Sequence, residues 1–431
     1  MVRKVSITHL VYILFISLLF CHALAAYSIA GIPLQWGAQL GVVLLCFYIF
    51  VRDKIFLFPG FNPFILLFTW AVLVTLGNNI VYDYAAILGG LATTKYEVFI
   101  FLRFLGLVFF LSCILLTYWL CINGYQEKLI NGIVNVAIII SLLSVYFYIA
   151  QILGLPEPPR TRAGTGGGEA STTFTYAFHR AMGTFREPSH LAEWLVVPFF
   201  LSYTLNKSFF NIKGLIMGGV LLLTGSLTGV ISIIGGLFLS IIFNLNFDSK
   251  AFKVLSRIVV PVLGAFLIFS AVTLVSKSES KSIITVLWER VEPIIYDKGV
   301  HSTNRSYVYK YFEEENTPLL GDGLGNSNIK FSKFMGIEAT VSFLNLFLNI
   351  SFSLGIIGLL LASAFILYPI ILYILSRNHL VGTKPIFLFS AYMAWMLIFF
   401  MHSEEFSLFF GVIYALVTYY LTATSRKSYA S

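Results

Sequence analysis

The sequence predicts an all-α, polytopic membrane protein. Of its 431 residues, 58% are hydrophobic and only 11% are charged, which is more apolar surface than a soluble core of this length can bury. The hydrophobic residues gather into uninterrupted runs of about twenty, the length that crosses a hydrocarbon layer roughly 30 Å thick. Because these runs lack the alternation of a barrel strand, and lipid tolerates only helices and closed barrels, we expect helices.

About twelve transmembrane helices are expected along the chain. Five precede the first long polar segment, four lie between the two polar segments, and three follow the second. The short run 212–226 is the weakest of them as a crossing. In order, the expected spans are 7–26, 33–51, 61–80, 98–122, 129–153, 190–206, 212–226, 228–246, 254–275, 353–375, 385–402 and 405–422.

Positive charge in the short connections predicts the orientation. With Met1 in the cytoplasm, the inner connections carry fourteen lysines and arginines but only three carboxylates, in agreement with the positive-inside tendency. Both termini are then cytoplasmic, and 154–189 and 276–340 become two long extracytoplasmic loops of a single membrane domain, 1–431. These lysines and arginines account for the net positive charge of the chain, so a nucleic-acid partner is not needed to explain it. The first run also resembles a cleavable signal peptide, whose removal would not invert the rest.

The two loops differ in composition. Gly164–Gly168 begins a Gly-, Ser- and Thr-rich stretch that we interpret as a mobile loop; a P-loop is disfavoured because no Lys-Ser/Thr pair follows. In the second loop, 302–315 is compatible with a helix and Pro318–Gly325 is rich in turn formers. Residues 341–352 are too close to the next span for a separate crossing and suit an interfacial helix. The four cysteines lie in apolar runs and are interpreted as packing residues.

The most informative string begins the sixth span. Its charged residues are Arg180, Arg186, Glu187, His190 and Glu193. The Pro-Ser pair after Glu187 suits a helix start, where unpaired N–H groups and the positive dipole end favour an anion such as phosphate. Glu193 shares a helical face with His190, and a carboxylate within a span indicates function. The structural alternative is that the arginines anchor lipid headgroups, Glu193 pairs with one of them, and Glu187 and His190 form a solvated rim.

Further candidates lie in other outer segments. Arg305 begins the helix-compatible stretch of the second loop, and His301 lies one turn before it. The structural alternative for Arg305 is a surface ion pair with a nearby glutamate. His402 and Glu404, between the last two spans, are secondary candidates for the same cavity, or else helix caps. Arg103 is interpreted as a residue that extends from the fourth span to the membrane surface.

Four features carry a resemblance to a known family. They are Arg180–Ala192 with its Gly-Thr-Phe-Arg-Glu-Pro-Ser core, Leu223–Gly229, Arg305 ahead of Pro318–Gly325, and Ser353–Leu360. Together they resemble the bacterial O-antigen polymerase and ligase superfamily of membrane glycosyltransferases, over about half of the chain. The resemblance implies a GT-C-like fold in the bacterial plasma (inner) membrane. It also implies glycan transfer from undecaprenyl diphosphate on the outer face, without a metal or another cofactor.

The resemblance points to a polymerase more than to a ligase. Its Glu-Pro-Ser variant resembles polymerases of O-antigen lipopolysaccharide, capsule or exopolysaccharide, and residues 341–345 lack the histidine expected of ligases. Fixed guanidinium groups can neutralise a departing diphosphate, so Arg180, Arg186 and Arg305 are the expected diphosphate-binding residues, with Arg305 also expected to be catalytic. Glu187 or His190 is the expected base.

We therefore expect a polymerase that moves a glycan chain from undecaprenyl diphosphate onto a lipid-linked repeat unit. A ligase that delivers the chain to another lipid acceptor is the first alternative. A transporter or flippase of lipid-linked oligosaccharide is the second, although transporters usually place their charges near the bilayer midplane. The expected partners are the lipid-linked donor and acceptor, membrane lipids, a chain-length regulator and a flippase.

Overall fold

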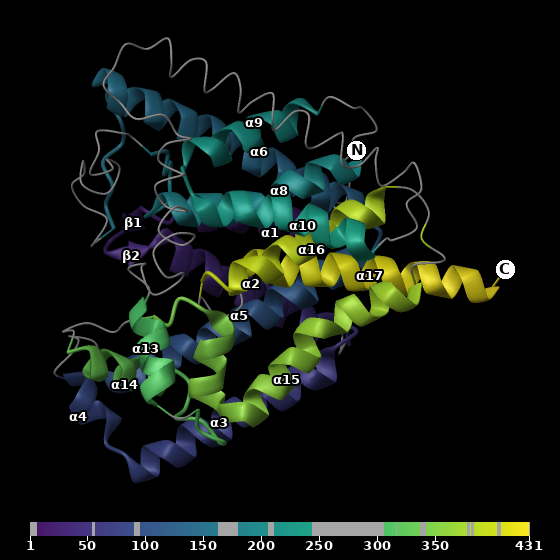
Figure 1. Cartoon of the computed structure of the whole chain (residues 1–431). Coiled ribbons are helices and arrows are strands. Elements are labelled where there is room, and N and C mark those ends of the chain that lie inside the picture. Colours follow the sequence, from purple (N-terminus) through teal and green to yellow (C-terminus); the bar gives the residue numbers. More distant parts are fainter. Residues whose placement is uncertain are drawn as a thin grey trace.

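The computed structural model describes residues 7–53, 57–89, 95–162, 180–205, 211–243, 306–315, 317–336, 342–376, 380, 383–402 and 407–430. Within these ranges, all regular structure is helical except one short hairpin (Figure 1). The elements are α1 (Ile7–Ala23), β1 (Ser28–Ile29), β2 (Ile32–Pro33), α2 (Leu34–Asp53), α3 (Phe61–Val81), α4 (Tyr84–Gly89), α5 (Tyr96–Ile122), α6 (Gln126–Leu153), α8 (Pro188–Leu205), α9 (Ile212–Leu223), α10 (Leu227–Phe243), α13 (Ser306–Glu314), α14 (Asn326–Met335), α15 (Leu346–Ser376), α16 (Lys384–Phe399) and α17 (Leu408–Ala430).

Each expected span but one coincides with a helix, whereas the short helices α4, α13 and α14 lie between the spans. The exception is the span 254–275, which lies outside the described residues. Five helices, α2, α3, α5, α6 and α15, are long and apolar enough to cross a membrane. On α2 and α3, large apolar side chains such as Phe47 and Leu73 are exposed, as expected of residues that face lipid. The helical, multi-pass character is therefore confirmed, whereas the number of crossings stays a prediction.

Helix α8 lies inside the bundle, among α6, α9, α10 and α16 (Figure 1). All of its residues from Leu191 to Tyr203 are buried. A helix that is apolar on every side belongs in the interior of a helical protein. The start of α8, with Arg186 just before it and His190 and Glu193 in its first turns, lies near the ends of α1 and α16 and the starts of α2 and α17.

Described residues of three expected inner connections lie together at one end of the bundle. Lys384, at the start of α16, lies 3.5 Å from Glu127 at the start of α6. The indole of Trp119, near the end of α5, donates to Asp53 at the end of α2 (3.0 Å). The hairpin, α13 and α14 lie toward the opposite end (Figure 1). The ends of α2 and α5 and the starts of α6 and α16 therefore lie together, and the side of the membrane that they face stays a prediction.

A two-stranded hairpin is an exception to the all-α prediction. Strands β1 and β2 pair antiparallel, with Ser28 opposite Pro33 and Ile29 opposite Ile32. The two residues between them, Ala30 and Gly31, have φ values of 51° and 80°. Two positive φ angles in succession make a turn whose twist matches that of the paired strands. Strands of two residues are too short to leave an alternating pattern in the sequence, so the hairpin was not predicted.

Helix α15 is broken at Gly355, where φ is 70° and ψ is −172°. The break frees backbone carbonyls, and lipid offers them no hydrogen-bond donor, so the protein must supply donors. The N–H groups of Asp322 and Gly323 and the indole of Trp70 donate to Phe352 O, Ser353 O and Leu354 O, at 2.9, 2.8 and 2.8 Å. The expected interfacial helix at 341–352 is therefore the first part of α15, bent against the turn that contains Asp322.

Candidate functional site

Short contacts hold the segment that leads into α8. Gly183 has a φ of 52°, and a Cβ there would lie 2.0 Å from Ser144 Oγ, so the chain needs glycine at this position. The Thr184 hydroxyl donates to Ala23 O (2.7 Å), and the Arg160 guanidinium donates to Gly183 O (3.1 Å). Burial lowers the pKa of Arg160 from its ordinary value, which is high enough that the residue stays cationic. The charged string therefore approaches the bundle along a fixed path.

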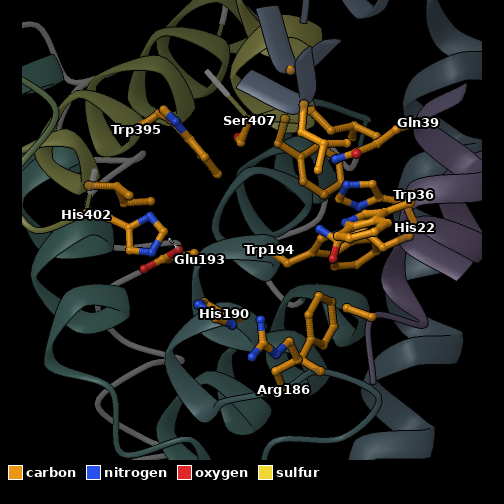
Figure 2. A pocket seen from close by; sticks show the side chains of 18 of the residues that line it. His22, Trp36, Gln39, Arg186, His190, Glu193, Trp194, Trp395, His402 and Ser407 are labelled. Atoms are coloured by element: carbon orange, nitrogen blue, oxygen red, sulfur yellow. Dashed lines mark ion pairs between the residues drawn. The ribbon is translucent and has the colours of Figure 1, made fainter. Parts of the chain in front are cut away.

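A cavity of about 280 Å³ lies beside the first turns of α8 (Figure 2). Aromatic rings form much of its wall: Trp36, Phe185, Trp194, Trp395, Phe399 and Phe409. The polar and charged lining residues are His22, Gln35, Gln39, Arg103, Arg162, Arg186, His190, Glu193, His402 and Ser407. Apolar walls with a few convergent polar groups are typical of sites for small molecules.

Three arginines from distant segments line this cavity. Arg103 lies on α5, Arg162 lies in the loop after α6, and Arg186 immediately precedes α8. Glu193 is the one carboxylate among the lining residues that the structure describes. An excess of fixed guanidinium groups favours an anionic ligand, and phosphate oxygens match the fork of guanidinium donors.

The three guanidinium groups are held differently. Arg162 donates to Ala25 O (2.9 Å) and to Gln35 Oε1 (3.0 Å). Arg103 lies over an aromatic ring of its own helix, 5.2 Å from the ring centre. The Nε of Arg186 is buried and has no hydrogen-bond partner in the described part of the chain. Because buried donors are nearly always paired in folded proteins, a ligand acceptor at Arg186 fits this site.

Glu193, His190 and His402 form a cluster on one wall of the cavity (Figure 2). Glu193 is 8% exposed, and its Oε2 lies 3.7 Å from Nδ1 of His402. The ring of His190 lies nearly perpendicular to that of His402, with 5.7 Å between centres. Carboxylate and imidazole groups are the side chains that general acid–base catalysis uses most often.

Four residues predicted from the sequence line the cavity together: Arg186, His190, Glu193 and His402. Three others, His301, Arg305 and Glu404, lie outside the described residues. The convergence of Arg305 with Arg186 therefore stays a prediction, as does any catalytic role of Arg305.

Two further predicted residues are placed away from the cavity wall. The Nε of Arg180 donates to Thr224 O (2.8 Å), at the end of α9. A cation is favoured there because the last carbonyls of a helix carry partial negative charge. Glu187 is exposed, and its Oε2 accepts a hydrogen bond from Ser189 Oγ (3.3 Å). The geometry thus favours a structural role for Arg180 and places Glu187 on the surface beside α8.

Sequence reasoning missed Arg162, Trp36 and His22 as lining residues. Arg162 did carry a signal, because a cation in an expected outer loop runs against the positive-inside tendency. Arg103 was interpreted as a residue that extends to the surface, whereas in the structure it lines the cavity. Trp36 and His22 carry no comparable signal, since single aromatic residues and histidines are common in helix packing.

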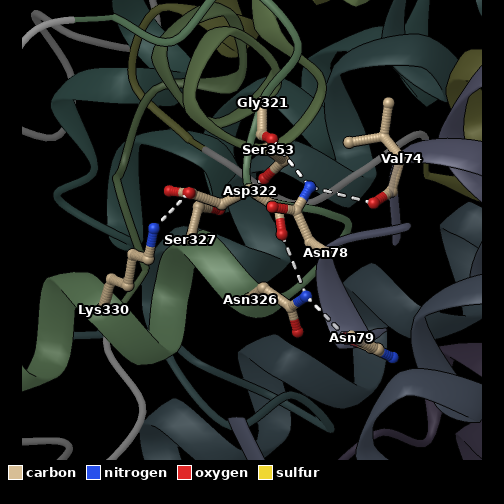
Figure 3. A network of polar contacts seen from close by, with 9 residues as sticks. All are labelled: Val74, Asn78, Asn79, Gly321, Asp322, Asn326, Ser327, Lys330 and Ser353. Atoms are coloured by element: carbon tan, nitrogen blue, oxygen red, sulfur yellow. Dashed lines mark hydrogen bonds and ion pairs between the residues drawn. The ribbon is translucent and has the colours of Figure 1, made fainter. Parts of the chain in front are cut away.

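A second polar cluster joins two of the segments that carried the resemblance (Figure 3). A Cβ on Gly321 would lie 2.5 Å from the backbone nitrogen of Gly355, so the turn and the helix break are in direct contact. Asn78 on α3 donates to Gly321 O (3.0 Å). The hydroxyl groups of Ser327 and Ser353 lie 2.5 Å apart. These contacts fasten the segment before α14 to α3 and α15.

Asn326 lies at the centre of this cluster and is fully buried. Its Oδ1 lies 2.6 Å from the Tyr96 hydroxyl, and its Nδ2 donates to Asn79 Oδ1 (3.1 Å) and to Asp322 O (2.9 Å). Several hydrogen bonds to one buried side chain hold it rigidly in place. The neighbouring Gly325 packs on Arg103, since a Cβ there would lie 3.3 Å from Arg103 Cγ. The cluster therefore supports one of the cavity arginines.

Chemically, the cavity offers cationic donors, a carboxylate–histidine cluster and aromatic walls. No group of three His, Cys, Asp or Glu side chains in the described ranges is arranged to hold a metal ion. No protein-family model matches the sequence, and no match to a curated protein was found.

Proposed function

We propose that the protein is a polysaccharide polymerase, a membrane glycosyltransferase that moves a glycan chain from undecaprenyl diphosphate onto a lipid-linked repeat unit. The observation that carries the proposal is the presence of Arg103, Arg162 and Arg186 in one cavity with Glu193 and its histidines. A diphosphate needs several cationic donors at once, and its charge grows as the glycan leaves. The string Arg180–Ala192 resembles the corresponding segment of O-antigen polymerases and ligases, which supports the same chemistry.

In this proposal the protein has a GT-C-like fold with about twelve crossings in a bacterial plasma membrane. Both termini face the cytoplasm, and the cavity faces outward. This orientation is supported by the gathering of Lys384, Glu127 and Asp53 at one end of the bundle. The lipid-linked donor and acceptor then meet on the outer leaflet, where a flippase delivers them and a chain-length regulator limits their growth.

The transfer breaks the bond between the anomeric carbon and a diphosphate oxygen. The electron pair leaves with undecaprenyl diphosphate, and the guanidinium groups neutralise that charge. A hydroxyl of the acceptor glycan attacks the anomeric carbon, and a positioned base removes its proton, which contributes roughly 10²–10⁴ in rate. Of the two bases expected from the sequence, His190 lines the cavity and Glu187 is exposed.

The proposal is tested with purified protein in proteoliposomes that contain a lipid-diphosphate oligosaccharide as both donor and acceptor. The wild type is expected to produce a ladder of longer glycans. Arg186→Ala is expected to reduce extension by about 100-fold, because a charged donor to the leaving group is lost. Arg52→Ala is the matched control, since Arg52 pairs with Asp53 at the other end of the bundle. An Arg186→Ala protein that extends glycans at the wild-type rate would contradict the proposal.

The same assay separates the two alternatives. A ligase would produce no ladder but would modify a separate lipid acceptor added to the vesicles. A transporter would move the lipid-linked oligosaccharide across the bilayer without forming a glycosidic bond.

A further inference from the structure

We infer that the indole N–H groups of Trp194 and Trp395 bind a carbonyl-type oxygen on the sugar that is attached to the diphosphate; this inference rests on the proposed function. Trp194 lies on α8 and Trp395 on α16, and both side chains line the cavity (Figure 2). The oxygen belongs to a substituent such as an acetamido group or a carboxylate. The two tryptophans therefore determine which sugar the cavity accepts.

The indole nitrogens of these two tryptophans are buried and have no hydrogen-bond partner in the described part of the chain. The side chains of Trp194 and Trp395 are only 5% and 4% exposed. Two tryptophans away from the cavity differ, since Trp70 donates to Leu354 O (2.8 Å) and Trp119 to a carboxylate on α2 (3.0 Å). An indole nitrogen can only donate, and buried ones usually find a partner. The unpartnered pair therefore indicates oxygen acceptors on a ligand.

Glycines on α10 allow the helices that carry both tryptophans to pack closely against it. A Cβ on Gly229 would lie 2.9 Å from Ala192 Cβ, two residues before the tryptophan of α8. A Cβ on Gly236 would lie 2.7 Å from Ala394 Cβ, next to the tryptophan of α16. Helices in such close contact cannot shift without a clash. The two indole groups thus project from helices that are held rigidly on a third.

The surroundings of Trp194 favour an oxygen that carries no hydrogen. Its ring centre lies 4.9 Å from that of Phe409 and 5.8 Å from that of Phe185. These rings offer no acceptor for the hydrogen of a hydroxyl group, whereas a carbonyl oxygen brings no hydrogen that needs one.

The same cavity separates the sugar from the diphosphate by charge. Diphosphate oxygens match the charged forks of the cavity arginines, which leaves the neutral indole donors for the sugar that is bonded directly to the diphosphate. The cavity volume of about 280 Å³ is at the small end of ligand pockets, which hold roughly 300–1,000 Å³. It therefore suits the diphosphate and its first sugar more than a longer stretch of glycan.

The test compares Trp194→Phe and Trp395→Phe with the matched control Trp119→Phe, whose indole is paired away from the cavity. Each full-length protein in nanodiscs is titrated with undecaprenyl diphosphate alone and with the same lipid carrying N-acetylglucosamine, glucuronic acid or glucose. The two cavity variants are expected to bind the acetamido or the carboxylate donor about 3–10-fold more weakly, because one hydrogen bond is lost. The donor that loses more affinity identifies the substituent.

The other titrations and the thermal stability provide the contrast. In the cavity variants, affinity for undecaprenyl diphosphate alone and for the glucose donor is expected to stay within about two-fold of wild type. Their thermal stability is expected to stay unchanged, because the buried N–H groups have no partner to lose among the described residues. Trp119→Phe is expected to show the reverse pattern, with lower thermal stability and wild-type affinity for every donor.

Three results would overturn the assignment. They are unchanged affinities in both cavity variants, an equal loss of affinity for undecaprenyl diphosphate with and without sugar, and a wild type that binds the glucose donor as tightly as both carbonyl-bearing donors. Should a phenylalanine variant fail to fold, benzothienylalanine at that position keeps the size of the ring and replaces the N–H by sulfur; unchanged affinity for every donor would then refute the role. Failure of the proposed function is distinguishable, because the wild type would bind donors without extending any glycan.

Discussion

Replacement of Gly355 by alanine tests how the break in α15 is stabilised. The residue has φ 70° and ψ −172°, a region that is essentially restricted to glycine and costs other residues about 1–3 kcal/mol. A Cβ would also lie 2.2 Å from Leu319 O and 2.6 Å from Gly321 N, which are backbone atoms that cannot rotate away. Such overpacking costs a further 1–3 kcal/mol or so. We therefore expect Gly355→Ala to reduce the free energy of unfolding by about 2–6 kcal/mol.

The expected loss is a large fraction of the roughly 5–15 kcal/mol that stabilises a typical domain. Gly77→Ala on α3 is the control, because Gly77 is helical and a Cβ there would meet no neighbouring atom within 4 Å. Alanine there should change stability by no more than about 1 kcal/mol, in the stabilising direction. Thermal unfolding in detergent micelles provides the comparison. A Gly355→Ala protein as stable as wild type would refute the account of a glycine-dependent break packed against the 319–323 turn.

The remaining predictions concern the arginines and the buried network. Arg180→Ala is expected to lower the free energy of unfolding by about 1–3 kcal/mol, because Thr224 O loses a charged donor. Arg186→Ala is expected to leave thermal stability unchanged, because Arg186 Nε has no hydrogen-bond partner to lose among the described residues, and to weaken undecaprenyl diphosphate binding. The reverse pattern in paired stability and binding measurements would contradict these roles. Asn326→Leu is expected to cost about 1–3 kcal/mol in chemical denaturation, since its half-buried partners Tyr96, Asn79 and Asp322 each lose one hydrogen bond. No measurable loss of stability would argue against a supporting network. Arg162→Ala is expected to weaken donor binding about 10-fold in a fluorescence titration, and unchanged affinity would exclude Arg162 from the diphosphate site.

The spans could be predicted because crossing a membrane demands long apolar segments that leave an unmistakable pattern. Glu193 could be predicted as a site residue for a related reason. A carboxylate inside a membrane span is energetically costly, so it is usually functional. Its partner His402 was a secondary candidate, but 209 positions of sequence separate them, and only the packing of α8 against α16 and α17 shows that they meet.

The missed features depend on tertiary contacts. The break at Gly355 lies two residues inside the expected span 353–375, and the carbonyls before it accept hydrogen bonds from Asp322, Gly323 and Trp70, which are distant in the sequence. Arg162 reaches the cavity because its loop bonds the hairpin region, with Ser28 N donating to Thr161 Oγ1 at 2.7 Å. Arg180 looked equivalent to Arg186 in the sequence, and only the position of Thr224 separates their roles. Local patterns therefore predicted the helices and the charged string, while long-range packing determined which charges share a cavity.

The central claim is that guanidinium groups from separate outer segments bind one lipid-linked diphosphate. An electron cryomicroscopy structure with undecaprenyl diphosphate bound tests it most directly. We predict diphosphate oxygens within about 3 Å of Arg186 and of Arg103 or Arg162, inside the cavity beside α8. A diphosphate bound elsewhere on the protein, with these three side chains uninvolved, would contradict the claim.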